Sequence, residues 1–187
     1  MLAGLLCWGC KQTDVTQVLD RAETCMAERP DSSLYLLRTL DKRHISGSLR
    51  KARYALLYSQ ALDKNYIDVD NDSLIRVAVD YYKGHGTSHE KALAYFYLGR
   101  VYDNAGDETR ATEAFVEAET HALDTDDHYI CGLIYSYLGN LYFSQYSFDE
   151  ALAMYDKSEK CYAQAGQLRN EGYMVCLLYT SDAADEL

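Results

Sequence analysis

The sequence is poor in the residues that interrupt helices. Pro30 is its only proline, and glycine accounts for 11 of its 187 residues. Folds made of short strands and tight turns need more of both residues than this. The shortage argues against strand-and-turn architecture and favours an all-α fold made of long helices.

The sequence also lacks an excess of positive charge. It carries 18 Lys and Arg against 29 Asp and Glu, a net charge of −11. Proteins that bind nucleic acid or anionic lipid usually present basic surfaces. We therefore expect no nucleic-acid partner for the repeat region, and we expect contact with a membrane only through an attached lipid. The longest apolar run, residues 131–143, is too short and polar to span a bilayer.

Motifs of catalysis and metal binding are missing or incomplete. No nucleophile elbow, P-loop or Rossmann glycine pattern is present. Residues 68–72 (DVDND) begin like a calcium loop, but Ser73 stands where that loop needs glycine. His85 and His89 have no third ligand nearby in the sequence. We expect a protein that is not an enzyme and that holds neither a metal nor a cofactor.

The six cysteines match neither a zinc site nor a dense disulfide framework in their spacing. Cys25, Cys131 and Cys161 fall in helical stretches, where the simplest role of cysteine is that of a small buried apolar residue. A disulfide between Cys131 and Cys161 is the alternative, and the sequence leaves it open.

A pattern of seven positions occurs twice, 40 residues apart. Its two copies begin in the stretches YFYLGRVYDNAGD (95–107) and YSYLGNLYFSQYS (135–147). The matched residues are Tyr95, Leu98, Gly99, Tyr102, Ala111, Phe115 and Ala118, then Tyr135, Leu138, Gly139, Tyr142, Ala151, Tyr155 and Ser158. The order resembles the tetratricopeptide repeat (TPR) family, whose usual period is about 34 residues.

The resemblance implies that each unit is a pair of antiparallel helices and that the units stack into a right-handed superhelix, an α-solenoid. It also implies that Gly99 lets the helix carrying Ala111 approach closely. The expected organisation is a signal-peptide remnant at 1–10, N-terminal helices at 11–47, a degenerate repeat at 48–87, repeats at 88–127 and 128–167, a truncated repeat at 168–175 and a non-native tail at 176–187.

Local signals place the ends of several helices. Residues 87–90 (TSHE) and 147–150 (SFDE) both have the spacing of a capping box, in which a hydroxyl and a carboxylate bind first-turn amides. Gly84 and Gly86 indicate the end of the helix before the first of these boxes.

In the TPR family the first helix of each unit lines a concave groove. This implies that the ligand binds to residues about 100° around that helix from its buried face. The candidate residues are Phe96, Tyr97, Arg100, Asp103, Asn104, Ser136, Tyr137, Asn140 and Phe143. Alternatively, the tyrosines are partly buried packing residues. We expect a non-catalytic scaffold that binds a protein or peptide segment. The sensory half of a longer signalling protein and a surface glycan-binding lipoprotein are alternatives.

The two ends of the chain resemble segments unrelated to the fold. MLAGLLCWGC (1–10) resembles the end of a bacterial lipoprotein signal peptide, which implies that Cys10 carries the lipid and that the protein is anchored in the bacterial cell envelope. An apolar N-terminus without a targeting role is the alternative. CLLYTSDAADE (176–186) resembles a translated sequencing adapter, with an ordinary acidic tail as the alternative.

Overall fold

The computed structural model describes residues 14–167, and this part of the chain is helical throughout. The predictions made for residues 1–10, for 168–175, for 176–187 and for Cys10 lie outside the described residues. Within 14–167 the elements are α1 (Val15–Cys25), α2 (Pro30–Arg38), the 3-10 helix η1 (Lys42–His44), α3 (Ser48–Lys64), α4 (Ser73–His85), α5 (Ser88–Asn104), α6 (Glu108–Ala122), α7 (His128–Ser144) and α8 (Phe148–Gln164).

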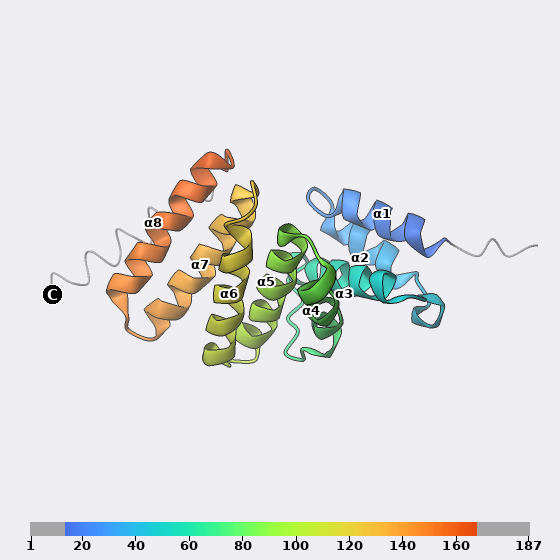
Figure 1. The fold of residues 1–187 in the computed structure, drawn as a ribbon, viewed down its shortest axis with the longest axis horizontal. Coiled ribbons are helices and arrows are strands. Elements are labelled where there is room, and N and C mark those ends of the chain that lie inside the picture. The colour runs from blue at the N-terminus through green and yellow to red at the C-terminus, as the bar shows by residue number, and fades with distance from the viewer. Residues whose placement is uncertain (1–13, 168–187) are drawn as a thin grey trace, which may run out of the picture.

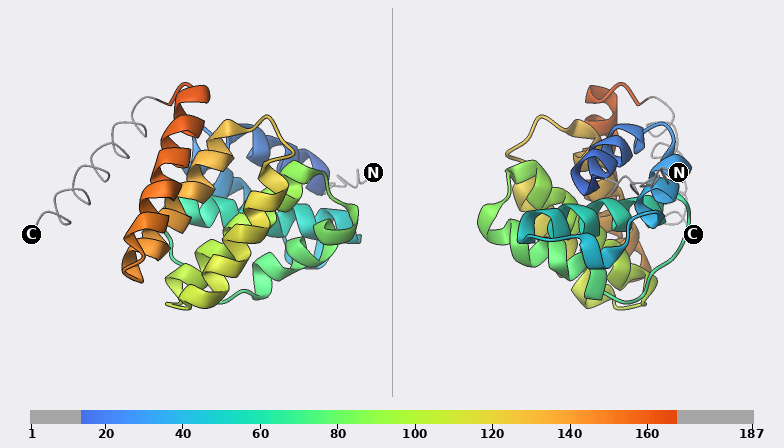
Figure 2. Two further views of the ribbon diagram at one scale, coloured as in Figure 1. Left: turned by 60° about the vertical axis from the view of Figure 1, so that its left-hand side comes forward. Right: turned by 90° about the vertical axis from the view of Figure 1, so that its right-hand side faces the viewer.

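The helices form antiparallel pairs that succeed one another in chain order. Figure 1 and the left-hand view of Figure 2 place α1 and α8 at opposite ends of this row. Each odd-numbered helix packs against its own partner and also against the next odd-numbered helix, so that α1, α3, α5 and α7 contact one another in sequence. The expected all-α helical-repeat solenoid is confirmed.

The 40-residue spacing governs the helices themselves. α3, α5 and α7 begin at Ser48, Ser88 and His128, and each is 17 residues long. α4 is shorter, because residues 65–72 form a loop before it begins at Ser73. The Asn71 side chain accepts a hydrogen bond from the Ser73 backbone amide at 2.9 Å. The degenerate repeat at 48–87 therefore differs from the later two units in the length of its second helix.

The repeated glycines face aromatic rings of the partner helix. A Cβ atom on Gly99 would lie 2.6 Å from ring carbons of Phe115, and one on Gly139 would lie 2.5 Å from the Tyr155 ring. No real Cβ fits at such distances, so the glycine is what allows each pair to close. The helix that carries Ala111 does approach Gly99 closely, as expected, and the side chain that meets the glycine is Phe115, one turn after Ala111.

The other repeated residues lie mainly in the core. Tyr95 and Tyr142 are only half-buried, and Tyr95 stacks on His121 with ring centroids 5.8 Å apart. The Tyr102 hydroxyl donates to Asp72 at 2.8 Å, which ties α5 to the loop before α4. The buried members are Leu98, Tyr102, Ala111, Phe115, Ala118, Tyr135, Leu138, Ala151, Tyr155 and Ser158.

Only one of the two expected capping boxes forms. The Thr87 hydroxyl accepts from the Glu90 amide, and the Glu90 carboxylate accepts from the Thr87 amide, which confirms the first box. Ser147 makes no capping hydrogen bond with its side chain, so the second prediction is wrong. Gly86 is the C-cap of α4, as expected, whereas Gly84 lies inside that helix.

Candidate functional site

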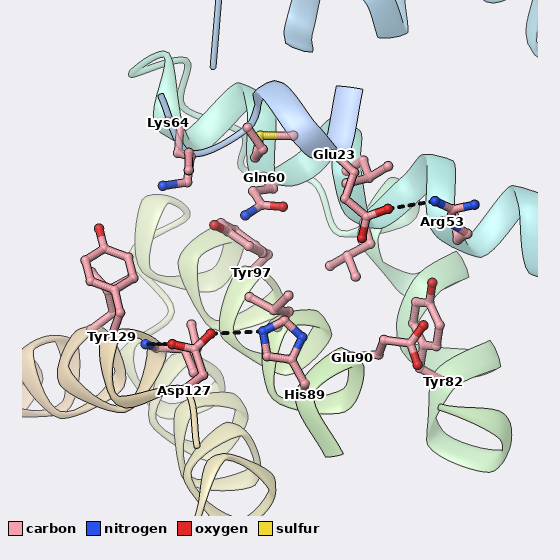
Figure 3. Close-up of a pocket in the computed structure, with 17 residues that line it drawn as sticks. Glu23, Arg53, Gln60, Lys64, Tyr82, His89, Glu90, Tyr97, Asp127 and Tyr129 are labelled. Atoms are coloured by element: carbon pink, nitrogen blue, oxygen red, sulfur yellow. Dashed lines mark hydrogen bonds and ion pairs between the residues drawn. The ribbon is translucent and has the colours of Figure 1, made fainter. Parts of the chain in front are cut away.

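A cavity of about 270 Å³ opens where the odd-numbered helices meet. α1, α3, α5 and α7 all contribute side chains to it, together with Asp127 from the loop before α7. Figure 3 shows side chains from these odd-numbered helices, and Tyr82 from α4, around the same space. We call this cavity the groove.

The groove has an apolar floor. Leucine side chains come from three successive odd-numbered helices, and Met26 closes the end next to α1. Leu93 and Leu133 occupy equivalent places, 40 residues apart, and both are half-buried. Apolar surface that stays partly open can be covered by a ligand with a favourable hydrophobic contribution. The floor residues are Met26, Leu56, Leu57, Leu93, Ile130 and Leu133.

One end of the groove is formed by a lysine and two tyrosines. The Lys64 ammonium lies 5.7 Å from the centroid of the Tyr129 ring, a cation–π arrangement that leaves its N–H donors available. The Tyr97 side chain hydrogen-bonds Gln60 across the interface of α3 and α5. Within the part of the chain that the structure describes, Lys64 has no carboxylate partner.

The other end carries a cluster of paired charges. Arg53 contacts Asp20 at 2.8 Å and Glu23 at 2.6 Å, which joins α3 to α1 along the wall of the groove. Glu90 lies nearby but is engaged by Thr87 in the cap of α5. In Figure 3, Glu23 and Glu90 lie toward the Arg53 end, whereas the Lys64 ammonium lies at the opposite end near Tyr129.

A hydrogen-bonded ion pair crosses the mouth of the groove between α5 and the start of α7. The His89 Nε2 atom lies 3.0 Å from Asp127 Oδ2, while Asp127 Oδ1 accepts from the Ile130 amide and caps α7. The hydrogen bond to Asp127 raises the pKa of His89 against the opposing effect of burial. The same bond lowers the pKa of Asp127. The pair sets the relative position of two successive units.

Three of the predicted groove residues line cavities, but only one of them lines the groove itself. Tyr97 lines the groove, and Arg100 and Asn104 line a small adjoining cavity of about 20 Å³. Arg100 is held by Asp63 at 2.9 Å and lies over the Tyr137 ring, 4.3 Å from its centroid. Asn104 donates to the Val69 carbonyl at 3.3 Å. These contacts tie α5 to α3, to the loop before α4 and to α7, and they leave little of Arg100 free.

Two predicted residues on α5 point elsewhere. Phe96 is only 1% exposed and packs against Phe115 and Tyr137 in the core, so its assignment to the groove is wrong. Asp103 lines neither of these two cavities and pairs with Arg100 at 2.7 Å. Adjacent helical residues lie about 100° apart, so an error of one position moves a side chain from the surface to the core.

The predicted residues on α7 are also dispersed. Tyr137 stacks on Phe115, with centroids 5.5 Å apart, as the packing alternative expects. Ser136 is buried, and Asn140 accepts a hydrogen bond from the Tyr155 hydroxyl at 2.9 Å. Phe143 is 46% exposed and meets the Phe148 ring edge to face at the far end of α7. None of these four lines the groove.

The sequence prediction missed the contribution of α3. Arg53, Leu57, Gln60 and Lys64 all line the groove. The signal was present, because residues 51–64 align with 91–104 at the 40-residue spacing. Carrying Leu93, Tyr97, Arg100 and Asn104 back by that spacing gives these four α3 residues. The residues from α1 follow no such rule, since α1 precedes the repeated region.

Other chemistry is sparse in residues 14–167. No three His, Cys, Asp or Glu side chains gather there in a group that could hold a metal ion. Among the described helices, none combines the length and apolar character that crossing a membrane requires. Cys25, Cys131 and Cys161 are free cysteines, and only Cys131 is fully buried.

Comparison with known proteins supports the fold and no more. No protein-family model matches the chain, and no curated protein does. A solved structure described as the crystal structure of BtubC (BKLC) from P. vanneervenii is similar over 90% of this chain and 74% of its own, with a TM-score of 0.50 and 16% identity. At that identity the similarity concerns the arrangement of helices alone.

Proposed function

We propose that this protein is a non-catalytic TPR-type scaffold that binds a peptide or protein segment in the groove. The observation that carries the proposal is the convergence of four odd-numbered helices on one open cavity with an apolar floor and polar walls. Rigid elements that present an apolar pocket beside a few fixed polar groups suit binding without turnover.

The size of the groove points to part of an extended chain as the ligand. About 270 Å³ is less than the volume that most small-molecule sites offer, which begins at about 300 Å³. One or two side chains of a peptide would fill it, with the rest of the peptide lying along the neighbouring helices. Lys64 and Gln60 would bind backbone or side-chain oxygens of that segment.

A groove substitution with a matched surface control tests the proposal. The full chain is screened against an array of extended peptides that carry apolar side chains, and binders are titrated by fluorescence anisotropy. Leu93→Glu places a charge on the floor, whereas Leu49→Glu makes the same change at an exposed position of α3 that lines neither the groove nor the adjoining cavity. We expect at least about tenfold weaker binding for the groove variant alone, a change of about 1.4 kcal/mol.

Two outcomes would overturn this function. Equal peptide binding by both variants would place the site outside the groove. An array that yields no binder, together with binding of an oligosaccharide, would favour the glycan-binding alternative. Circular dichroism of each variant establishes first that the helices have formed.

The proposal includes a lipid anchor on Cys10 in the bacterial envelope. It rests on the resemblance of residues 1–10 to a lipoprotein signal peptide. Metabolic labelling with a fatty-acid analogue should modify the wild-type protein and not the Cys10→Ser variant. Labelling that persists in the variant would remove the anchor and leave the groove proposal intact.

A further inference from the structure

Two cysteines lie at the same level of the last described helix pair. Cys131 belongs to α7 and is 7% exposed, whereas Cys161 belongs to α8 and is only partly buried. Cys161 packs against the core cluster that contains Cys131. Both are free thiols in this structure. Cys161 is therefore the more accessible of the two thiols.

The next residues along each helix show how closely α7 and α8 approach here. A Cβ atom on Gly132 would lie 2.7 Å from the Tyr162 ring, so the helices come together at the residues that follow the two cysteines. The Ser158 hydroxyl donates to the Gly132 carbonyl at 2.8 Å, one turn before Cys161. These contacts hold the two thiols beside each other on a rigid framework.

The two thiols also differ in acidity. The Cys131 thiol has two acceptors within reach, the Ala122 carbonyl at 3.6 Å and the sulfur of Cys161. Its hydrogen bond to Cys161 lowers the pKa of Cys161, to which the charge of Lys157 adds. The same bond, followed by burial, raises the pKa of Cys131. A thiolate therefore forms first on the more accessible sulfur.

We propose that Cys131 and Cys161 form a dithiol site that reacts with small-molecule disulfides and closes a disulfide bond between α7 and α8. This site is separate from the groove and does not depend on the proposed function. It is also local to this unit, since the residues 40 positions earlier are Lys91 and His121.

The reaction takes two exchange steps. The Cys161 thiolate attacks one sulfur of the small-molecule disulfide, forms a mixed disulfide and releases one small thiolate, and its own proton has gone to solvent. Cys131 then loses its proton to solvent and attacks the Cys161 sulfur, which forms the protein disulfide and releases the second small thiolate. Two cysteines are oxidised while one small disulfide is reduced to two thiols.

Peptide mapping of the full chain tests the site. The folded protein is incubated with glutathione disulfide, the remaining thiols are blocked with an alkylating reagent, and trypsin is added. Cys131 lies in the tryptic fragment 111–157 and Cys161 in the fragment 161–169. We expect these two fragments to appear joined by a disulfide in the wild type. Cys25→Ala, which changes a cysteine on α1, should leave that product unchanged.

Single variants separate the attacking thiol from the second one. Cys131→Ala should accumulate a glutathione adduct on Cys161, because no second thiol is present to displace it. Cys161→Ala should lose the linked product and leave Cys131 largely free of glutathione. The proposal is overturned if the wild type gives no linked fragments, or if Cys131 in Cys161→Ala takes up glutathione as fast as Cys161 does in Cys131→Ala.

Discussion

The pairs α3/α4 and α5/α6 occupy equivalent places in the solenoid but close in different ways. In α5/α6 a glycine accommodates an aromatic ring, with Gly99 facing Phe115. The positions 40 residues earlier hold Ser59 and Ile75, both buried. A larger residue on the first helix is thus accompanied by a smaller one on the second. We infer that the smaller residue on the second helix compensates for the larger one on the first, so that the two side chains together fit the space between the helices.

The largest change in stability is expected from a substitution that fills the space at Gly99. Gly99→Val should destabilise the protein by about 1–3 kcal/mol, because Phe115 must move to admit the new side chain. Chemical denaturation followed by circular dichroism measures the change. Gly84→Ala is the matched control, since Gly84 lies in α4 with open space around it and should gain about 0.5–1 kcal/mol from helix propensity.

A double substitution tests whether the residues at positions 99 and 115 compensate for each other in volume. Gly99→Ser alone should be destabilising, and its cost should fall when Phe115→Ile is also present, because this combination reproduces the residues of α3/α4. Contacting residues usually show coupling of about 0.5–3 kcal/mol in such a cycle. Strictly additive costs would mean that volume compensation does not explain the difference between the pairs.

The fold was predictable from the sequence because its signals are local and repeated. Gly99 and Gly139, with their aromatic partners one helix later, define a unit that two copies make visible. The candidate site was less predictable, because facing the groove or the core depends on the rotation of each helix. Phe96 and Tyr97 are adjacent and both aromatic, yet only the second lines the groove.

The two predicted capping boxes offer a second test, with an effect of intermediate size. Thr87→Ala removes the hydroxyl that caps α5 and should cost about 1 kcal/mol. Ser147→Ala should cost much less, because the Ser147 side chain makes no capping bond to α8. Equal losses in thermal or chemical unfolding would contradict the structural difference between two nearly identical sequence signals.

The smallest expected effect concerns the junctions between units. His89 and Asp127 pair at 3.0 Å between α5 and α7, whereas the positions 40 residues earlier hold Leu49 and Thr87, which cannot form an ion pair. The raised pKa of His89 means that its stabilising contribution is complete below its ordinary pKa of 6.5 and is lost as pH rises through the folded value. The lowered pKa of Asp127 makes its contribution complete above 3.8 and lost at more acidic pH.

The junction should therefore be most stable between pH 3.8 and 6.5. His89→Leu places leucine at this junction, as the earlier junction has at Leu49. The variant cannot form the pair with Asp127, so it should lack this pH range of higher stability, while the other titrating groups stay in place. As pH rises from about 5 to about 9, the denaturant concentration at the unfolding midpoint should fall by more in the wild type than in His89→Leu. The difference should be small because His89 is half-exposed and solvent screens the pair. An identical pH dependence in both proteins would show that Asp127 positions α7 through its bond to the Ile130 amide alone.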